Sequence, residues 1–246
     1  MRTLLSLWLA AGTAVLAQPV PESPQERGWA VLEAALKAAG GREKLAAVKD
    51  MTFELQTHVV TPAGPLDLKS KSLFVLPDTV RQEIATPAGA AIIALDRWSG
   101  WRIGPGGRDE IPAAELQRTQ AELARTNILF RAPADRSAVR WAGTDTVGER
   151  ACDLIEIANV AGAPIRLCVD RQSGDVVKRS YRGPGPDGKP AAVEELLSDF
   201  RTVDGLRLYF RVRVLRDGKL ARESVTSNMK INVGLKAEEL LKPPPK

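Results

Sequence analysis

The strongest constraint on the fold of this chain is a set of segments in which apolar and polar residues alternate. The clearest segment covers residues 206–214, where every even position is apolar and arginines occupy positions 207, 211 and 213. Successive side chains of a strand point to opposite faces, so such a segment has one buried face and one solvated face. This pattern indicates an antiparallel sheet, because the strands of a doubly wound α/β sheet are apolar on both faces.

Other segments repeat the pattern. Residues 53–59 and 66–76 predict long strands, residues 79–86, 90–96 and 98–103 predict shorter ones, and alternation resumes between residues 138 and 231. Turn residues separate these segments, among them Asp204-Gly205 and Asp217-Gly218. We expect about ten or eleven strands in total.

Two longer segments have helical periodicity. Residues 23–26 read Ser-Pro-Gln-Glu, which combines an N-cap serine, a first-turn proline and a capping-box glutamate. Trp29, Leu32 and Leu36 then recur on one face before two glycines at positions 40 and 41 end the helix. A second helix is predicted between Pro112 and Pro133, and short helical turns are predicted at residues 42–48 and 236–241.

A sheet of this many long strands twists, and its apolar face must be covered. The sequence therefore predicts a mainly β, α+β fold in which a single curved antiparallel sheet forms an unclosed half-barrel covered by two or three helices. No Ser- or Gly-rich linker divides the chain, so we expect one domain at residues 18–242 and a proline-rich tail at residues 243–246.

Residues 1–17 have the composition of a cleavable export signal. A basic start precedes an apolar stretch at residues 4–16, and Val15 and Ala17 stand three and one positions before the expected cleavage point. Gln18 follows, so a lipid-modified cysteine is not expected. The alternative is a membrane anchor, but the apolar stretch is shorter than the roughly 20 residues that a span needs. We predict a periplasmic or secreted mature chain without a transmembrane segment.

An exported chain meets an oxidising compartment, which favours a disulfide between Cys152 and Cys168. The two cysteines lie in strand-like segments joined by a turn. A loop centred on Val160 would place Cys152 opposite Cys168, and Leu154 opposite Arg166, on the more polar side of the hairpin. A redox-active pair is the alternative, but no Cys-x-x-Cys spacing occurs.

The sequence offers few residues for catalysis. With one histidine and two cysteines, zinc sites of the Cys₄, Cys₂His₂ or His₃ type cannot form within one copy. Serine-hydrolase elbows, His-Glu-x-x-His and phosphate-binding glycine loops are missing. His58 shares the polar face of its strand with Glu54 and Gln56, and the adjacent Glu194 and Glu195 point to opposite faces. We predict a non-enzymatic protein without metal or cofactor; if activity exists, His58 is the residue to test.

The formal net charge of +5 is too small to indicate a nucleic-acid partner. A basic ridge is nevertheless expected at Arg207, Arg211 and Arg213, on the polar face of one strand. This ridge is either simply solvated or contacts anionic headgroups or an acidic partner.

The order of the segments resembles a known superfamily. An opening helix, several strands, an Asp-x-x-x-x-Trp segment at residues 96–101 and a helix after Ile-Pro-Ala-Ala-Glu-Leu at residues 111–116 are similar to the LolA/LolB-type carriers. Residues 169–178 and 200–206 also resemble hairpin segments of that superfamily, whose members include outer-membrane lipoprotein-sorting proteins. The resemblance implies an unclosed barrel with a helical lid, whose apolar interior takes up acyl chains in the periplasm.

Alternation places one set of apolar side chains on the face that would line such an interior. The candidate ligand-binding residues are Phe53, Leu55, Val59, Phe74, Ile93, Trp101, Phe210, Val212 and Val214 on the strands, with Leu116, Leu123 and Ile128 on the lid helix. The expected ligand is a lipid or the acyl chains of a lipoprotein. Plain core packing is the alternative for each residue, and an envelope protein-interaction module that uses the curved sheet or its basic face is the alternative for the whole protein.

Overall fold

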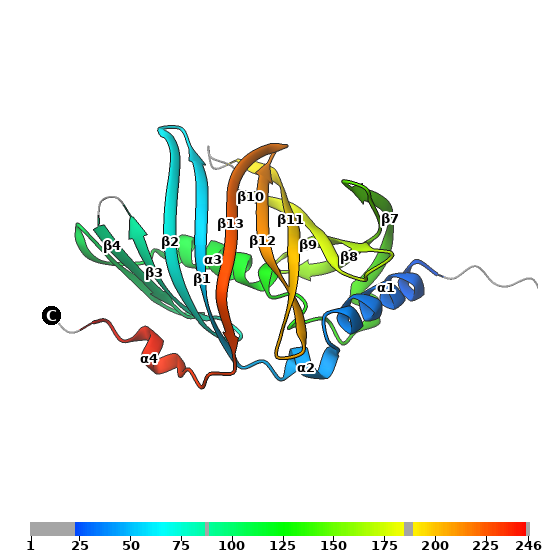
Figure 1. The fold of residues 1–246 in the computed structure, drawn as a ribbon, viewed down its shortest axis with the longest axis horizontal. Helices are drawn as coiled ribbons and strands as arrows, with labels where there is room; N and C mark the ends of the chain where they lie inside the picture. The colour runs from blue at the N-terminus through cyan, green and yellow to red at the C-terminus, as the bar shows by residue number, and fades with distance from the viewer. Residues whose placement is uncertain (1–22, 87–88, 185–188, 245–246) are drawn as a thin grey trace, which may run out of the picture.

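The computed structural model describes residues 23–86, 89–184 and 189–244, and the predicted export signal lies outside them. Within these residues thirteen strands form one antiparallel sheet (Figure 1). The strands are β1 (Asp50–Thr61), β2 (Gly64–Val75), β3 (Thr79–Thr86), β4 (Gly89–Leu95), β5 (Gly100–Gly104), β6 (Gly107–Glu110), β7 (Val139–Val147), β8 (Arg150–Val160), β9 (Ala163–Asp170), β10 (Val176–Pro184), β11 (Pro190–Val203), β12 (Leu206–Arg216) and β13 (Lys219–Ile231). The helices are α1 (Pro24–Ala38), α2 (Arg42–Ala46), α3 (Ala113–Thr126) and α4 (Ala237–Leu241), with a 3₁₀ turn η1 (Arg136–Ala138).

The strand order explains why the sheet stays open. It runs β6-β5-β4-β3-β2-β1-β13-β12-β11-β10-β9-β8-β7, so the last strand returns to the centre beside β1. β6 and β7 form the two edges and do not pair with each other. Because α3 connects these two edges in sequence, it must cross the width of the sheet. The predicted fold class, a single curved and unclosed antiparallel sheet with helical cover, is confirmed.

The predicted number of strands was too low. The described residues contain thirteen strands rather than about ten or eleven, whereas their four α-helices match the two longer helices and the two short helical turns that the sequence predicts. β6 is a strand that the sequence did not predict. It consists of a glycine and three charged residues, all exposed, so it shows no alternation of apolar and polar residues.

α1 forms as its N-terminal sequence predicts. The Ser23 hydroxyl accepts a hydrogen bond from the Glu26 backbone N–H at 3.1 Å, and the Glu26 carboxylate accepts one from the Ser23 N–H at 2.9 Å. This capping box satisfies two of the N–H groups that a helix start leaves unpaired. Leu32 and Leu36 are then buried in the largest core cluster, with Ile155 and Leu167 of β8 and β9.

Cys152 and Cys168 form the predicted disulfide, with 5.5 Å between their Cα atoms. The expected register is wrong by two residues, because Cys152 lies opposite Asp170 and Leu154 lies opposite Cys168. The physical reason is the turn, which uses positive φ at Ala161 and at the glycine after it, so the hairpin is centred beyond Val160. The bond therefore crosses the β8–β9 pair diagonally.

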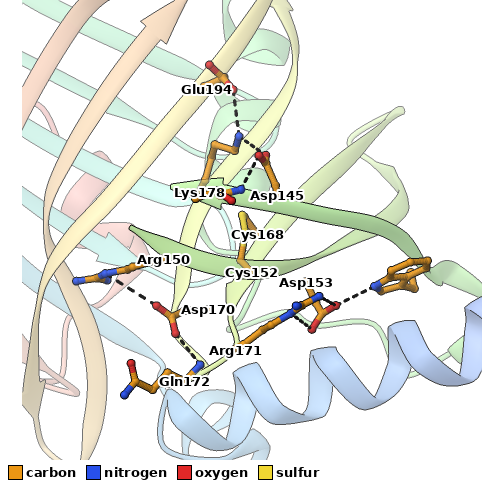
Figure 2. The surroundings of a disulfide bond; sticks show 12 residues. Asp145, Arg150, Cys152, Asp153, Cys168, Asp170, Arg171, Gln172, Lys178 and Glu194 are labelled. Carbon is orange, nitrogen blue, oxygen red and sulfur yellow. Dashed lines mark hydrogen bonds and ion pairs between the residues drawn. A yellow bond between two sulfur atoms is a disulfide. The ribbon is translucent and has the colours of Figure 1, made fainter. Parts of the chain in front are cut away.

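The disulfide lies on the face of the sheet that carries charged side chains, as expected, but both cysteines are fully buried (0% exposed). Figure 2 shows Lys178 of β10 nearby, between Asp145 at 2.5 Å and Glu194 at 3.3 Å. Burial lowers the pKa of Lys178, but the two carboxylates outweigh it and raise the pKa overall. The hydrogen bond from Lys178 in turn lowers the pKa of Asp145.

Candidate functional site

α3 crosses one face of the sheet and is tied to it by polar contacts. Arg102 of β5 reaches Glu115 near the start of α3 at 3.0 Å, and Arg222 of β13 reaches Glu122 farther along the helix at 3.6 Å. Figure 1 shows α3 passing behind β1 and β13 in that view. We call the side of the sheet that faces α3 the helix face, and it is the candidate site.

The end of α3 is held by a buried arginine that the sequence analysis missed. Arg179 of β10 donates to the Thr126 carbonyl at 2.7 Å and pairs with Glu195 of β11 at 2.7 Å. The Tyr181 hydroxyl donates to Glu195 at 3.0 Å, and the Tyr209 hydroxyl lies 3.3 Å from Arg179. Both side chains of the ion pair are 4% exposed.

Burial and charge act in opposite directions on this cluster. Burial lowers the pKa of Arg179, but the negative charge of Glu195 outweighs it and raises the pKa. Burial, followed by the same carboxylate, raises the pKa of Tyr181. Glu194 and Glu195 do point to opposite faces, as predicted, but Glu195 is the one buried. The signal that could have revealed this pair is the register between β10 and β11. A buried arginine and a buried glutamate at inward positions of neighbouring strands must pair, because an unpaired buried charge is costly.

Most of the predicted ligand-binding residues lie together on the helix face. Phe53 and Phe74 stack with 5.5 Å between ring centroids. These two rings and Val212 pack against the main core, and Phe74 and Ile93 also pack in a second cluster with the lid residues. That cluster contains Leu116 and Leu123 of α3, while Ile128 lies in the main core. Val214 is buried in register with Glu195 and Arg222.

Leu55 and Val59 lie on the same face but belong to none of the core clusters that the described residues form. Val59 pairs directly with Leu66, and Ser70 lies between Leu55 and Ile84 in the register. These residues and Leu68 form a band of partly exposed apolar side chains across β1, β2 and β3. We call this band the open strip; its members are Leu55, Val59, Leu66, Leu68 and Ile84.

Two predicted residues lie elsewhere. Trp101 is on the opposite face, where its indole N–H donates at 2.7 Å to the carbonyl of Leu241, the last residue of α4, and the Arg81 guanidinium lies over its ring. Its register with Ala94 and Arg81 places it away from α3. Phe210 is buried, but it is covered by the guanidinium of Arg201, 4.7 Å from its centroid, and joins none of the described core clusters.

Two hollows of the structure differ in size and in the elements that line them. A cavity of about 40 Å³ lies beneath the helices beside Arg179 and Leu197, and it has room for little more than a water molecule. A larger hollow of about 530 Å³ lies over β1–β4. Its lining comes from strands alone and includes Gln56, Lys69 and Lys71, whose register places them on the face away from α3, together with Leu55, Ser70 and Ile84 of the helix face. The larger hollow is therefore not under the helices, where the sequence analysis expected the ligand cavity.

Solved structures share this architecture. A LolA superfamily protein from Nitrosomonas europaea superposes with a TM-score of 0.61 at 12% identity, covering 88% of this chain and 97% of its own. The chain has a LolA-like fold. A DUF1329 family protein from Desulfovibrio piger gives a TM-score of 0.59 at 13% identity, covering 89% and 97% of the two chains. A domain described as outer membrane lipoprotein-sorting, from Vibrio parahaemolyticus, gives 0.54 at 10% identity, covering 88% and 97%.

The comparisons by sequence find no match, either to a family model or to a curated protein. The likeness therefore concerns the fold. Among the described helices of this LolA-like chain, none is both long and apolar enough to cross a membrane.

The basic ridge of the LolA-like sheet is largely neutralised. Arg207 forms two hydrogen bonds with the Asp175 carboxylate, at 2.8 and 3.0 Å. Arg211 pairs with Glu223, and Arg213 lies 4.0 Å from the same carboxylate. Each arginine of the ridge thus has an acidic neighbour, which weakens the case for an anionic partner on this face.

His58 is exposed on the face away from α3, as predicted, and its Nδ1 lies 2.8 Å from the Asp67 carboxylate. The hydrogen bonds of the described residues connect this pair to no serine, threonine or cysteine that could act as a nucleophile. Across the same residues, no group of three or more His, Cys, Asp or Glu side chains is arranged to hold a metal ion.

Proposed function

We propose that this chain is a non-enzymatic binding or carrier protein for a hydrophobic ligand, a lipid or the acyl chains of a lipoprotein, in the bacterial cell envelope. The observation that carries the proposal is the open strip, which lies on the helix face of a LolA-like sheet and outside the core clusters. An acyl chain laid along this strip would remove apolar surface from water, which is favourable by about 25 cal/mol per Å².

The proposed location is the periplasm. A buried disulfide between Cys152 and Cys168 supports it, because such bonds persist in oxidising compartments. The export-signal pattern at residues 1–17 supports the same location.

Extension of a long chain from the open strip into the space beneath the C-terminal end of α3 would require α3 to move relative to the sheet, because the cavity there holds only about 40 Å³. The contacts of Glu115 and Glu122 with arginines are partly exposed ion pairs, which contribute little to stability and exchange readily with water. The structure is in this respect a closed form, and the ligand would replace contacts between α3 and the helix face.

The proposal is tested by titrating the mature chain with 1-N-phenylnaphthylamine, which fluoresces in apolar surroundings, and by competition with oleoyl ligands. We expect saturable uptake with a stoichiometry near one. Leu68→Gln, in the open strip, should weaken binding several-fold, whereas Lys69→Gln, the next residue on the opposite face, should leave it unchanged. Absence of uptake by well-folded protein would overturn the proposal, and mass spectrometry of the purified chain would identify any copurified lipid.

A further inference from the structure

The helix face carries a band of uncharged polar side chains beside the open strip. We call it the hydroxyl belt; its members are Ser72, Ser70, Gln82, Thr57, Thr226 and Ser224. They occupy four neighbouring strands in the order β3, β2, β1 and β13, and all are buried or partly buried. Direct register pairs join Ser72 to Gln82 and Thr57 to Ser224. Alternation alone would predict apolar residues at these inward positions.

Internal hydrogen bonds satisfy only part of the belt. The Gln82 amide N–H group donates to the Ser70 hydroxyl at 3.2 Å and to the Ser72 hydroxyl at 3.4 Å. The hydroxyls of Thr57 and Ser224 lie 3.0 Å apart. Within the described residues, the Gln82 side-chain oxygen has no hydrogen-bond donor. An acceptor at Gln82 and a donor at Ser70 therefore remain available for a further group.

α3 passes over this belt without bonding to it. Arg102, which contacts Glu115, pairs with Ile93 of β4, and Ile93 pairs on its other side with Gln82 of the belt. Arg222, which contacts Glu122, is the next inward residue after Ser224 on β13. The two ion pairs thus mark the two ends of the belt. Among the described contacts, the polar side chains of α3 bond elsewhere: Gln120, for example, donates to the Asp78 and Asp96 carbonyls.

The chemistry of the belt identifies what it can bind. Polar groups covered by an acyl chain without a partner cost about 1–3 kcal/mol each, so a purely hydrocarbon ligand suits this surface poorly. The belt contains no charged side chain, and the two arginines at its ends are already paired with glutamates. An anionic headgroup therefore finds no free cation at the belt, whereas a neutral ester, amide or hydroxyl finds both a donor and an acceptor.

We propose that the hydroxyl belt is a specificity-determining subsite for the neutral polar linkage of an amphiphile, with Gln82 and Ser70 as its hydrogen-bonding residues. The acyl chain of that amphiphile lies along the open strip. This inference rests on the proposed function, because it assigns the ligand class of the same helix face.

The test compares two probes of equal chain length, monooleoyl glycerol and 1-octadecene, in competition with 1-N-phenylnaphthylamine. Gln82→Leu should weaken binding of monooleoyl glycerol roughly tenfold, the worth of one or two hydrogen bonds, and leave binding of 1-octadecene unchanged or tighter. Gln56→Leu is the matched control, because Gln56 lies on β1, two strands from Gln82, and on the opposite face, and it should change neither affinity.

Two outcomes separate this inference from the proposed function. If neither probe binds wild-type protein that is well folded, the proposed function fails and the inference fails with it. If both probes bind but Gln82→Leu changes the two affinities equally, the inference alone is overturned. Should Gln82→Leu lower the thermal midpoint markedly, Ser70→Ala removes the neighbouring hydroxyl with a smaller change in volume and should show the same selective loss.

Discussion

The two ends of the sheet are held together in different ways. At the disulfide end, which comprises β7–β10 and α1, Ile155, Ile165 and Leu167 are fully buried on one face and the Cys152–Cys168 bond is buried on the other. At the open end, which comprises β1–β4, the helix face carries the partly exposed open strip and the hydroxyl belt. The opposite face there carries exposed charged residues beside a hollow of about 530 Å³.

The difference teaches where a ligand can be accommodated. Ligand-binding elements come from the less stable parts of a protein, since they must open or adapt, and those parts have few buried apolar contacts. A region buried on both faces, as at the disulfide end, is poorly suited to this role. Stability is thus concentrated at one end of the sheet and accessible surface at the other. Four tests, each built on one or two substitutions, can break or sharpen this contrast.

Glu195→Ala should have the largest effect. It leaves the Arg179 charge buried with the Tyr209 hydroxyl and the Arg125 and Thr126 carbonyls as its remaining partners, and breaking a buried pair in this way costs about 3–5 kcal/mol. Guanidinium denaturation measures the loss in the free energy of unfolding.

The adjacent residue is the control for that experiment. Glu194 pairs with Lys178 at 3.3 Å and its side chain is 40% exposed, so Glu194→Ala should cost less than about 1 kcal/mol. Equal losses for the two variants would show that the buried cluster contributes nothing special to holding the end of α3.

The next largest effect is expected from removing the disulfide with the double change Cys152→Ala and Cys168→Ala. The bond closes a loop with a sequence separation of 16, for which the chain-entropy model gives about 3 kcal/mol. Hydrogen exchange should show faster opening in β8 and β9 and unchanged exchange in β1–β4. Loss of protection spread evenly over the sheet would argue against two distinct ends.

Alternation and turn residues were sufficient to predict the class of this fold. The capping box at Ser23, the helix after Pro112 and the arginine-bearing strand at residues 206–214 all occur as predicted. These features are local, because each depends on residues a few positions apart. The disulfide pairing was also predictable, although its register was not, since the hairpin register depends on the positive-φ turn residues Ala161 and Gly162.

The missed features depend on contacts between distant segments. In the sequence, Arg179 and Glu195 each look like an ordinary polar residue of a strand. Only the pairing of β10 with β11 under the end of α3 makes them a buried ion pair. Trp101 was placed on the wrong side of the sheet because α4, more than a hundred residues later, covers the other face there. The belt residues fall within strands that the sequence predicts, but only the register between those strands shows that the residues are contiguous across four strands.

The third test is Gly28→Ala, for which we expect the opposite of the effect that helix propensity predicts. Alanine favours helix over glycine by up to about 1 kcal/mol, so the sequence alone predicts stabilisation. In the structure, a Cβ at Gly28 would lie 2.5 Å from the backbone of Arg140 and Trp141, where α1 crosses β7. We expect a net loss of about 1–3 kcal/mol from overpacking, measured by denaturation. A gain in stability would mean that α1 packs less closely on the disulfide end.

The smallest effect is expected at the open end. Leu66 of the open strip is partly exposed and lies outside the described core clusters, so Leu66→Ala should cost about 1 kcal/mol or less. The same substitution at Leu167, which is fully buried at the disulfide end, should cost about 2–5 kcal/mol. The comparison is made by denaturation of both variants without ligand and then with monooleoyl glycerol. Ligand should stabilise Leu66→Ala less than Leu167→Ala, because only Leu66 belongs to the proposed binding surface; equal stabilisation of both variants would place the ligand elsewhere.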